Sequence, residues 1–248
     1  MIRLSGLRAV VLDIEGTTCP VDFVAGTLFP YAHRHLEAHL AKHGGDPAMA
    51  PLLQEIWQGW ADETDPAAPP LPAAEARQAL AAVPYLQWLI SRDRKFTPLK
   101  DLQGQIWAAG YHHGELRTPL FEDVAPALQR WAALGLRLAV YSSGSVQAQQ
   151  LFYGHTAAGD LQPLFSAWYD TRLGPKREAA SYRALLEDLQ LPAAAVLFIS
   201  DSAGELEAAT SAGLQVCGSQ RPGNPETLSP HWLQVQHFGE LTVTAGAV

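Results

Sequence analysis

The sequence has few cysteines, no excess of basic residues and no apolar run long enough to cross a bilayer. Its two cysteines, Cys19 and Cys217, match neither a disulfide framework nor a zinc site, so we expect a reducing, cytoplasmic setting. The net charge of −8 excludes the general electrostatic footprint of a protein that binds nucleic acid or an anionic membrane. The first apolar run is broken by Asp13, too early for a signal-peptide core or a membrane span. We therefore expect neither a nucleic-acid nor a membrane partner.

What the sequence does have is a set of short, nearly continuous apolar runs separated by helical patterns. Such runs are typical of strands in a parallel sheet that is covered on both faces. The predicted strands are 7–13, 136–142, 166–171, 195–200 and 214–218, and the predicted helices are 121–134, 145–153, 176–190 and 203–212. The alternation of strand and helix predicts an α/β fold with a doubly wound, Rossmann-like parallel-sheet core.

The front of the chain breaks this alternation. Residues 22–120 contain helical patterns without a convincing strand, and the proline-rich stretch 64–74 indicates a loop inside them. We therefore expect a core of 1–21 and 121–248 with an inserted all-helical domain at 22–120. Four tryptophans fall in this insert, and their plain interpretation is a small helical core rather than a cofactor site. They are Trp57, Trp60, Trp88 and Trp107.

The first predicted strand ends in two carboxylates, Asp13 and Glu15. Residues i and i+2 of a strand point to the same side, and open α/β sheets bind ligands at the carboxyl ends of their strands. Gly16 permits a sharp exit from the strand, and Thr17 and Thr18 offer hydroxyls and amides to an anion. The alternative is two solvated acids in a loop, which is the ordinary explanation for an isolated pair of this kind.

Polar residues also follow the other predicted strands. Ser142, Ser143 and Ser145 open the next helix, where free N–H groups form an anion site, although one of these serines could simply cap the helix. Lys176 stands at the start of a predicted helix, where a cation opposes the helix dipole unless it pairs with a bound phosphate; alone, it would be a solvated lysine. Asp201 ends another strand and could cap the next helix. Hard oxygen ligands gathered in this way suit Mg²⁺ with a phosphate.

This combination resembles the haloacid-dehalogenase-like phosphatases and, more narrowly, the enolase-phosphatases of methionine salvage. The resemblance covers most of the chain, and the phrases that carry it are LDIEGTTCPVDFVAGTLFPYA (12–32), LQGQIWAAGY (102–111), VYSSGSVQAQQLFYGHTAAGD (140–160) and RPGN (221–224). Glu15 replaces the Asp of most of the wider superfamily, as in the methionine-salvage branch. Cys19 stands where that branch has Thr, and we interpret it as an inert small residue.

The resemblance implies a helical cap at 22–120 and a phosphatase that uses Mg²⁺. Asp13 would attack phosphorus, and Glu15 would act as acid and base. Ser142, Ser143 and Lys176 would bind the phosphate, and the metal would be held by Asp13, Asp201 and the backbone carbonyl of Glu15. The substrate would be 2,3-diketo-5-methylthiopentyl 1-phosphate, enolised and then dephosphorylated to the acireductone 1,2-dihydroxy-3-keto-5-methylthiopentene. The sequence does not identify the base for enolisation, and we expect a monomer.

Other possibilities stay open at this point. Lys100 is a candidate for substrate contact, with a solvated lysine as the alternative. His35, His39 and His43 recur on one helical face, but we interpret them as a solvated face because they lack the arrangement of a zinc motif. A phosphatase for another small ester, a dehalogenase and a catalytically silent binding module are the competing functions. A chelator separates the dehalogenase, because that reaction needs no magnesium.

Overall fold

The chain divides into two units in the computed structural model, which describes residues 1–246. One unit, here called the core unit, comprises Met1–Phe23 and Leu116–Val248, and the other, the helical unit, comprises Val24–Glu115. The division therefore falls a few residues inside the insert expected from the sequence. Thr118 illustrates the reason, because its backbone N–H donates to the carbonyl of His155 in the core unit at 2.9 Å.

A six-stranded parallel sheet forms the centre of the core unit. Its order is β4-β3-β2-β5-β6-β7. The strands are β2 (Ala9–Leu12), β3 (Arg137–Tyr141), β4 (Phe165–Tyr169), β5 (Val196–Ser200), β6 (Gln215–Ser219) and β7 (Gln234–Val235). The first five correspond to the five predicted strands, so the doubly wound α/β core is confirmed.

β2 lies in the middle of this sheet, with β3 on one side and β5 on the other. Leu12 at the end of β2 is in register with Val140 of β3 and Ile199 of β5. The chain builds outward in one direction through β3 and β4, and then in the other through β5, β6 and β7. The carboxyl ends of β2, β3 and β5 therefore meet at a topological switch point, where open α/β sheets bind their ligands.

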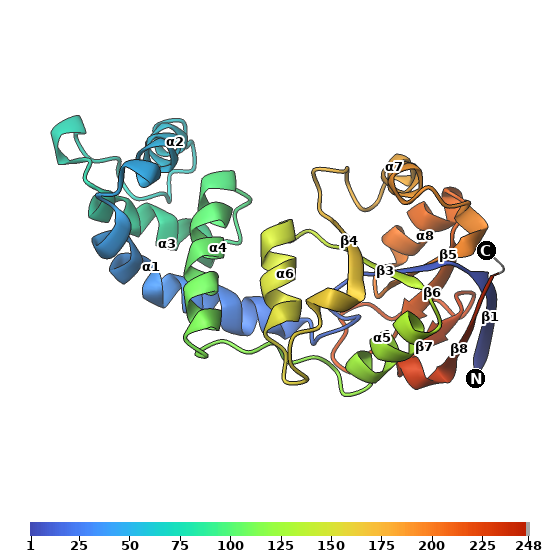
Figure 1. Ribbon diagram of the computed structural model, residues 1–248. Coiled ribbons are helices and arrows are strands. Elements are labelled where there is room, and N and C mark those ends of the chain that lie inside the picture. Colours follow the sequence, from blue (N-terminus) through green and yellow to red (C-terminus); the bar gives the residue numbers. More distant parts are fainter. Residues whose placement is uncertain (247–248) are drawn as a thin grey trace. The chain divides into compact units, whose positions relative to one another are not determined.

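Helices cover both faces of the sheet (Figure 1), with α7 (Ala179–Leu189) and α8 (Ala203–Ser211) on one face and α5 (Val124–Ala133) on the other. The α7–α8 face is apolar because alternate strand residues such as Val11 and Phe198 pack against Tyr182 of α7 and Leu206 of α8. α6 (Val146–Gly154) follows β3. The four predicted helices are present.

One helix boundary differs from the prediction. α7 begins at Ala179, so Lys176 precedes the helix and lies in a turn after Gly174 and Pro175. The prediction that Lys176 opens a helix against its dipole was therefore wrong. Gly174 has a φ of +153°, which side-chain-bearing residues rarely adopt, and its carbonyl accepts a hydrogen bond from Tyr141 at 2.9 Å.

The sequence prediction missed three strands. β1 (Ile2–Leu7) and β8 (Leu241–Ala245) pair in parallel as a separate two-stranded sheet, and β7 adds two residues to the edge of the main sheet. β1 carries polar residues such as Arg3 and Ser5, and it is more exposed than the central strands. Its partner lies at the other end of the chain, so no local pattern predicts the pairing.

The helical unit contains α1 (Phe29–His43), α2 (Ala50–Ala61), α3 (Val83–Ser91) and α4 (Thr97–His112), with short 3₁₀ turns between them. No strand is assigned between Val24 and Glu115. Four of its rings stack in a row, of which Trp60 and Tyr85 are buried: Trp57 lies 5.7 Å from Trp60, Trp60 4.8 Å from Tyr85, and Tyr85 5.8 Å from Trp88. These contacts agree with a helical core made of tryptophans, and the loop at 64–74 is also present.

Candidate active site

The nucleophile candidate Asp13 directly follows β2 and lies at the switch point of the sheet. It is 7% exposed, and its backbone N–H donates to the carbonyl of Ile199 in β5 at 3.0 Å. The chain then turns tightly, because the N–H groups of Thr17 and Thr18 both donate to the carbonyl of Ile14. Gly16 allows this turn with a φ of +67°.

A cavity of about 260 Å³ opens at this point of the core unit. Its lining brings together residues that are far apart in the sequence but share the carboxyl ends of the strands. The lining residues include all six candidates from the sequence: Asp13, Glu15, Ser142, Ser143, Lys176 and Asp201. It also includes Arg177, Ser202, Glu205 and Glu226, which the sequence analysis did not single out as site residues.

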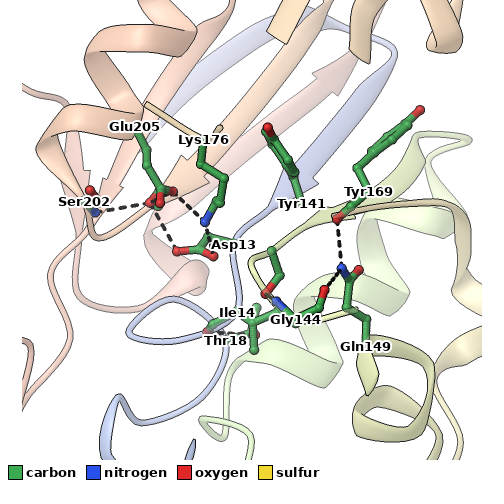
Figure 2. A network of polar contacts seen from close by, with 12 residues as sticks. Asp13, Ile14, Thr18, Tyr141, Gly144, Gln149, Tyr169, Lys176, Ser202 and Glu205 are labelled. Carbon is green, nitrogen blue, oxygen red and sulfur yellow. Dashed lines mark hydrogen bonds and ion pairs between the residues drawn. The ribbon is translucent and has the colours of Figure 1, made fainter. Parts of the chain in front are cut away.

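Lys176 is the centre of the charge network in this cavity (Figure 2). Its Nζ lies 2.6 Å from Oδ1 of Asp13 and 2.7 Å from Oε2 of Glu205, and all three side chains are close to nine-tenths buried. Burial lowers the pKa of Lys176, but the two carboxylates outweigh this and raise the pKa above its ordinary value. The ammonium group is therefore charged, and it holds Asp13 in place.

The carboxylates of the cavity are not all neutralised by this lysine. Burial, followed by the charge of Asp13, raises the pKa of Asp201 to about 7. The same two causes raise the pKa of Glu205 above its ordinary value, against the opposing effect of Lys176. The site therefore has more negative charge than its own side chains compensate, and a further cation would be stabilised there.

The loop after β3 is fixed by the side chain of Gln149, which the sequence did not indicate. Gln149 of α6 is 1% exposed, and its Nε2 donates at 2.8 Å to the carbonyls of both Gly144 and Tyr169 (Figure 2). Ser145 caps α6 by accepting from the N–H of Ala148. Ser142 is buried at the rim of the cavity, while Ser143 is exposed. The loop that carries Ser142 and Ser143 is therefore held in place by the hydrogen bonds of Gln149.

One expectation about the turn after Asp13 was wrong in part. Thr17 and Thr18 are fully buried, and their N–H groups donate within the turn, so these amides are not available to an anion. The Thr18 hydroxyl bonds to the Ile14 carbonyl and to Tyr153 Oη instead. Cys19 is also fully buried, and burial followed by nearby carboxylates raises the pKa of its thiol, which fits an inert packing role.

Several singled-out residues lie in the helical unit rather than in the core unit. Lys100 is exposed on α4, and its contact with substrate stays a prediction. His35 stacks on Tyr31 at 4.1 Å, and His39 lies 3.1 Å from Oε1 of Gln105. These histidines thus have packing or hydrogen-bonding partners of their own.

Sequence pattern alone gave no signal for Gln149 and only a weak one for Glu205. Glu205 follows Asp201 by four residues, and that spacing could have suggested a second acid on the first turn of α8. Gln149 looks like an ordinary helical glutamine, and only the packing of α6 shows that it bonds two carbonyls.

Comparison with known proteins identifies the family of the chain. Residues 7–213 match the family model of haloacid dehalogenase-like hydrolases, and the chain belongs to this family. Its curated relatives include proteins named Enolase-phosphatase E1. The protein from Synechococcus sp. (strain RCC307) is 64% identical over 99% of this chain and 98% of its own length. That from Pseudomonas aeruginosa (strain UCBPP-PA14) is 47% identical over 88% and 91%. Within the family, the chain therefore groups with the enolase-phosphatases E1 and is a phosphatase-type hydrolase.

Among solved structures, the UTR4 protein from Saccharomyces cerevisiae matches with a TM-score of 0.76 and 29% identity, over 94% of this chain and 98% of the other. The likeness supports the same fold over nearly the whole chain. Within residues 1–246, no helix combines the length and apolar character required to cross a membrane.

Proposed function

We propose that the protein is a magnesium-dependent enolase-phosphatase. It enolises 2,3-diketo-5-methylthiopentyl 1-phosphate and then dephosphorylates the enol phosphate, which gives the acireductone of methionine salvage and free phosphate. The observation that carries the proposal is the convergence of Asp13, Glu15, Lys176 and Asp201 on one cavity, in a chain that groups with the enolase-phosphatases E1.

The charges of the cavity support a divalent cation. Five carboxylate residues and two cationic residues line it, so its formal charge is −3, and a phosphate dianion would be repelled without a further positive charge. The carboxylates are Asp13, Glu15, Asp201, Glu205 and Glu226, and the cations are Lys176 and Arg177. Hard oxygen ligands of this kind suit Mg²⁺ rather than a softer metal.

The proposed ligands are the carboxylates of Asp13 and Asp201 and the backbone carbonyl of Glu15. Within residues 1–246, no three or more His, Cys, Asp or Glu side chains are grouped so that they could hold a metal ion. Two carboxylates completed by a backbone oxygen, water and substrate phosphate are the usual ligands of Mg²⁺. When bound, the metal supplies the charge that lets a carboxylate approach a phosphate dianion.

The side chains around phosphorus divide the chemistry between them. An oxygen of Asp13 attacks phosphorus and the bond to the substrate oxygen breaks, while Glu15 gives a proton to that leaving oxygen. Glu15 then takes a proton from water as the water attacks the aspartyl-phosphate, which releases phosphate and restores Asp13. Lys176, with Ser142 and Ser143, stabilises the charge on the phosphoryl oxygens during both transfers.

The test uses the diketo phosphate with Mg²⁺, and follows ultraviolet absorbance and free phosphate together. The wild-type protein should form the enol and release phosphate. Asp13→Asn should accumulate the enol phosphate without free phosphate, because the amide still offers an oxygen to the metal but cannot attack phosphorus. Asp93→Asn in the helical unit is the matched control, since its side chain is exposed and Asn tolerates its φ of 47°.

Three results would contradict the proposal. Phosphate release from generic esters, with no enol formed from the diketone, would indicate an ordinary phosphatase of this fold. Near wild-type phosphate release by Asp13→Asn would exclude the aspartyl-phosphate step. Full activity in excess chelator would exclude the magnesium requirement.

A further inference from the structure

Asn224 lies behind the turn that follows Asp13, and its amide has a fixed orientation. Its Nδ2 donates to the carbonyl of Gly16 at 3.1 Å and to the carbonyl of Ser219 at 2.9 Å. Both partners are acceptors, so the NH₂ group must face them and the amide oxygen must face the other way. Asn224 thus joins the end of β6 to the turn that carries the proposed metal ligands.

The amide oxygen of Asn224 is buried and has no hydrogen-bond partner among the described residues. Distances measured from Gly16 place this oxygen near Asp201. A Cβ built on Gly16 would be 2.2 Å from Oδ2 of Asp201 and 3.0 Å from Oδ1 of Asn224. The two oxygens therefore converge on the same side of Gly16, in a gap that only glycine leaves open.

A buried acceptor without a donor costs free energy, and a structure retains one where a donor is supplied by something else. When Asp201 holds a cation it is ionised and offers only acceptors, so it does not satisfy the amide oxygen. A cation held by Asp201 brings water ligands, and each of these is a strong hydrogen-bond donor. A water ligand on this side would satisfy Asn224 without displacing any protein group.

We propose that Asn224 is a positioning residue of the metal site, whose amide oxygen accepts a hydrogen bond from a water ligand of the divalent cation at Asp13 and Asp201. The inference rests on the proposed function, because it requires that cation. Such outer partners orient the ligands of a metal, and their loss weakens metal binding about 10- to 100-fold.

Asn224 also braces the turn, and this simpler role must be separated from the proposed one. Ser219 provides the matched control, since its Oγ donates to the same Gly16 carbonyl at 3.0 Å. Ser219→Ala removes one bond from that carbonyl and leaves the oxygen beside Asp201 intact. Asn224→Ala removes a bond from the same carbonyl and also removes that oxygen. Asn224→Ala also removes the bond to the Ser219 carbonyl, so a larger loss of metal affinity in Asn224→Ala reports on the amide oxygen and this second bond together.

The experiment measures metal affinity in the full-length protein without substrate. Mn²⁺ is titrated and followed by its electron paramagnetic resonance signal, and Mg²⁺ affinity is obtained by competition. Asn224→Ala should weaken Mn²⁺ binding about 10-fold or more, while Ser219→Ala should stay within about 3-fold of wild type. Asn224→Ser is measured in parallel, because it keeps a small polar group at this position but its hydroxyl is too short to reach the Asp201 side. It should bind metal as weakly as Asn224→Ala.

The outcomes distinguish this inference from the proposed function. Wild-type affinity in Asn224→Ala or Asn224→Ser overturns the role of Asn224 and leaves the enolase-phosphatase proposal standing. An equal loss in Ser219→Ala also overturns it, because the effect would then come from the turn. If the wild-type protein binds neither Mn²⁺ nor Mg²⁺, the magnesium-dependent function fails, and the role of Asn224 fails with it.

Discussion

The core unit and the helical unit differ in how deeply they bury the charged side chains of their ion pairs. In the core unit, Lys176 and Asp13 are 9% and 10% exposed in their side chains, and Arg221 and Asp123 are both 2% exposed. In the helical unit, the ion pairs stay open on at least one side, as with Lys95, which is 72% exposed. The helical unit instead buries aromatic rings such as Trp60 and Tyr85, which stack at 4.8 Å.

The difference reflects what each kind of burial contributes. Aromatic rings give apolar area and good packing at little cost in desolvation. Buried ion pairs give little net stability, because removing charges from water costs about as much as their attraction returns. A protein that needed stability alone would have little reason to bury Lys176 or Arg221. Their burial indicates that these charges serve the site or hold the loops that form it.

We expect the two units to differ most when one lysine of each is replaced by methionine. Lys176→Met leaves Asp13 and Glu205 as buried carboxylates without a cation. It also removes the ammonium group that would stabilise the charge on the phosphoryl oxygens. We expect phosphate release to fall about 10²–10³-fold and the free energy of unfolding to fall by about 3 kcal/mol. Lys95→Met should leave activity unchanged and change stability by less than about 0.5 kcal/mol. Turnover assays and urea unfolding measure both, and equal effects of the two substitutions would remove the contrast.

A second comparison of the two units concerns the free energy of unfolding rather than catalysis. Arg221 pairs with Asp123 at 2.9 Å, donates to the carbonyls of Thr17 and Gln236, and lies over the ring of Phe238 at 4.4 Å. Arg221→Met should lower the free energy of unfolding by about 3 kcal/mol, because it leaves the Asp123 carboxylate buried without its cation.

The matched substitution in the helical unit is Arg94→Met. Arg94 is 45% exposed in its pair with Glu63. The loss should stay below about 1 kcal/mol, since solvent screens the pair. Chemical denaturation of both variants checks the prediction, and a loss in Arg94→Met as large as that in Arg221→Met would contradict it.

The buried pair should also make the core unit sensitive to acid. Burial raises the pKa of Asp123, but hydrogen bonds from Arg221 and from the N–H of Phe238 outweigh this and hold the pKa below its ordinary value. The unfolded chain therefore binds more protons near pH 4, so this contribution to stability is present above that pH and is lost as the pH falls through the folded pKa. Asp123→Asn should flatten the stability curve below about pH 4. An unchanged slope in thermal unfolding between pH 5 and pH 2.5 would refute this.

The smallest expected effect is on the two cysteines, both of which lie in the core unit. Cys217 is fully buried, and burial raises the pKa of its thiol to about 12, with a smaller contribution from Glu240. Cys19 is buried in the same way. A thiol reagent at pH 8 should therefore leave both unmodified in the native protein and modify both in denaturant. Rapid modification of either thiol in the native protein would show that the core unit opens locally.

Much of the core fold could be predicted because its signals are local. Five strands of the central sheet are continuous apolar runs, and each of the predicted helices follows from periodicity within about 10 residues. The strands β1 and β8 could not be found in this way, because they pair across almost the whole length of the chain. The start of α7 was misplaced because residues 175–178 form a turn, closed by the N–H of Glu178 donating to the Pro175 carbonyl, and the helix begins only at Ala179.

The sequence by itself determined the order of the elements and the chemical type of the candidate residues at the strand ends. Asp13, Ser142 and Asp201 could be selected because parallel strands place their carboxyl ends at one edge, which follows from connectivity alone. Only the tertiary structure decided which groups touch. Glu205 meets Lys176 at 2.7 Å, and Asn224 meets Gly16 at 3.1 Å, although neither contact follows from a local pattern. The physical reason is that periodicity reports burial and direction within one element, whereas hydrogen bonds and ion pairs depend on distances that arise only when distant elements pack.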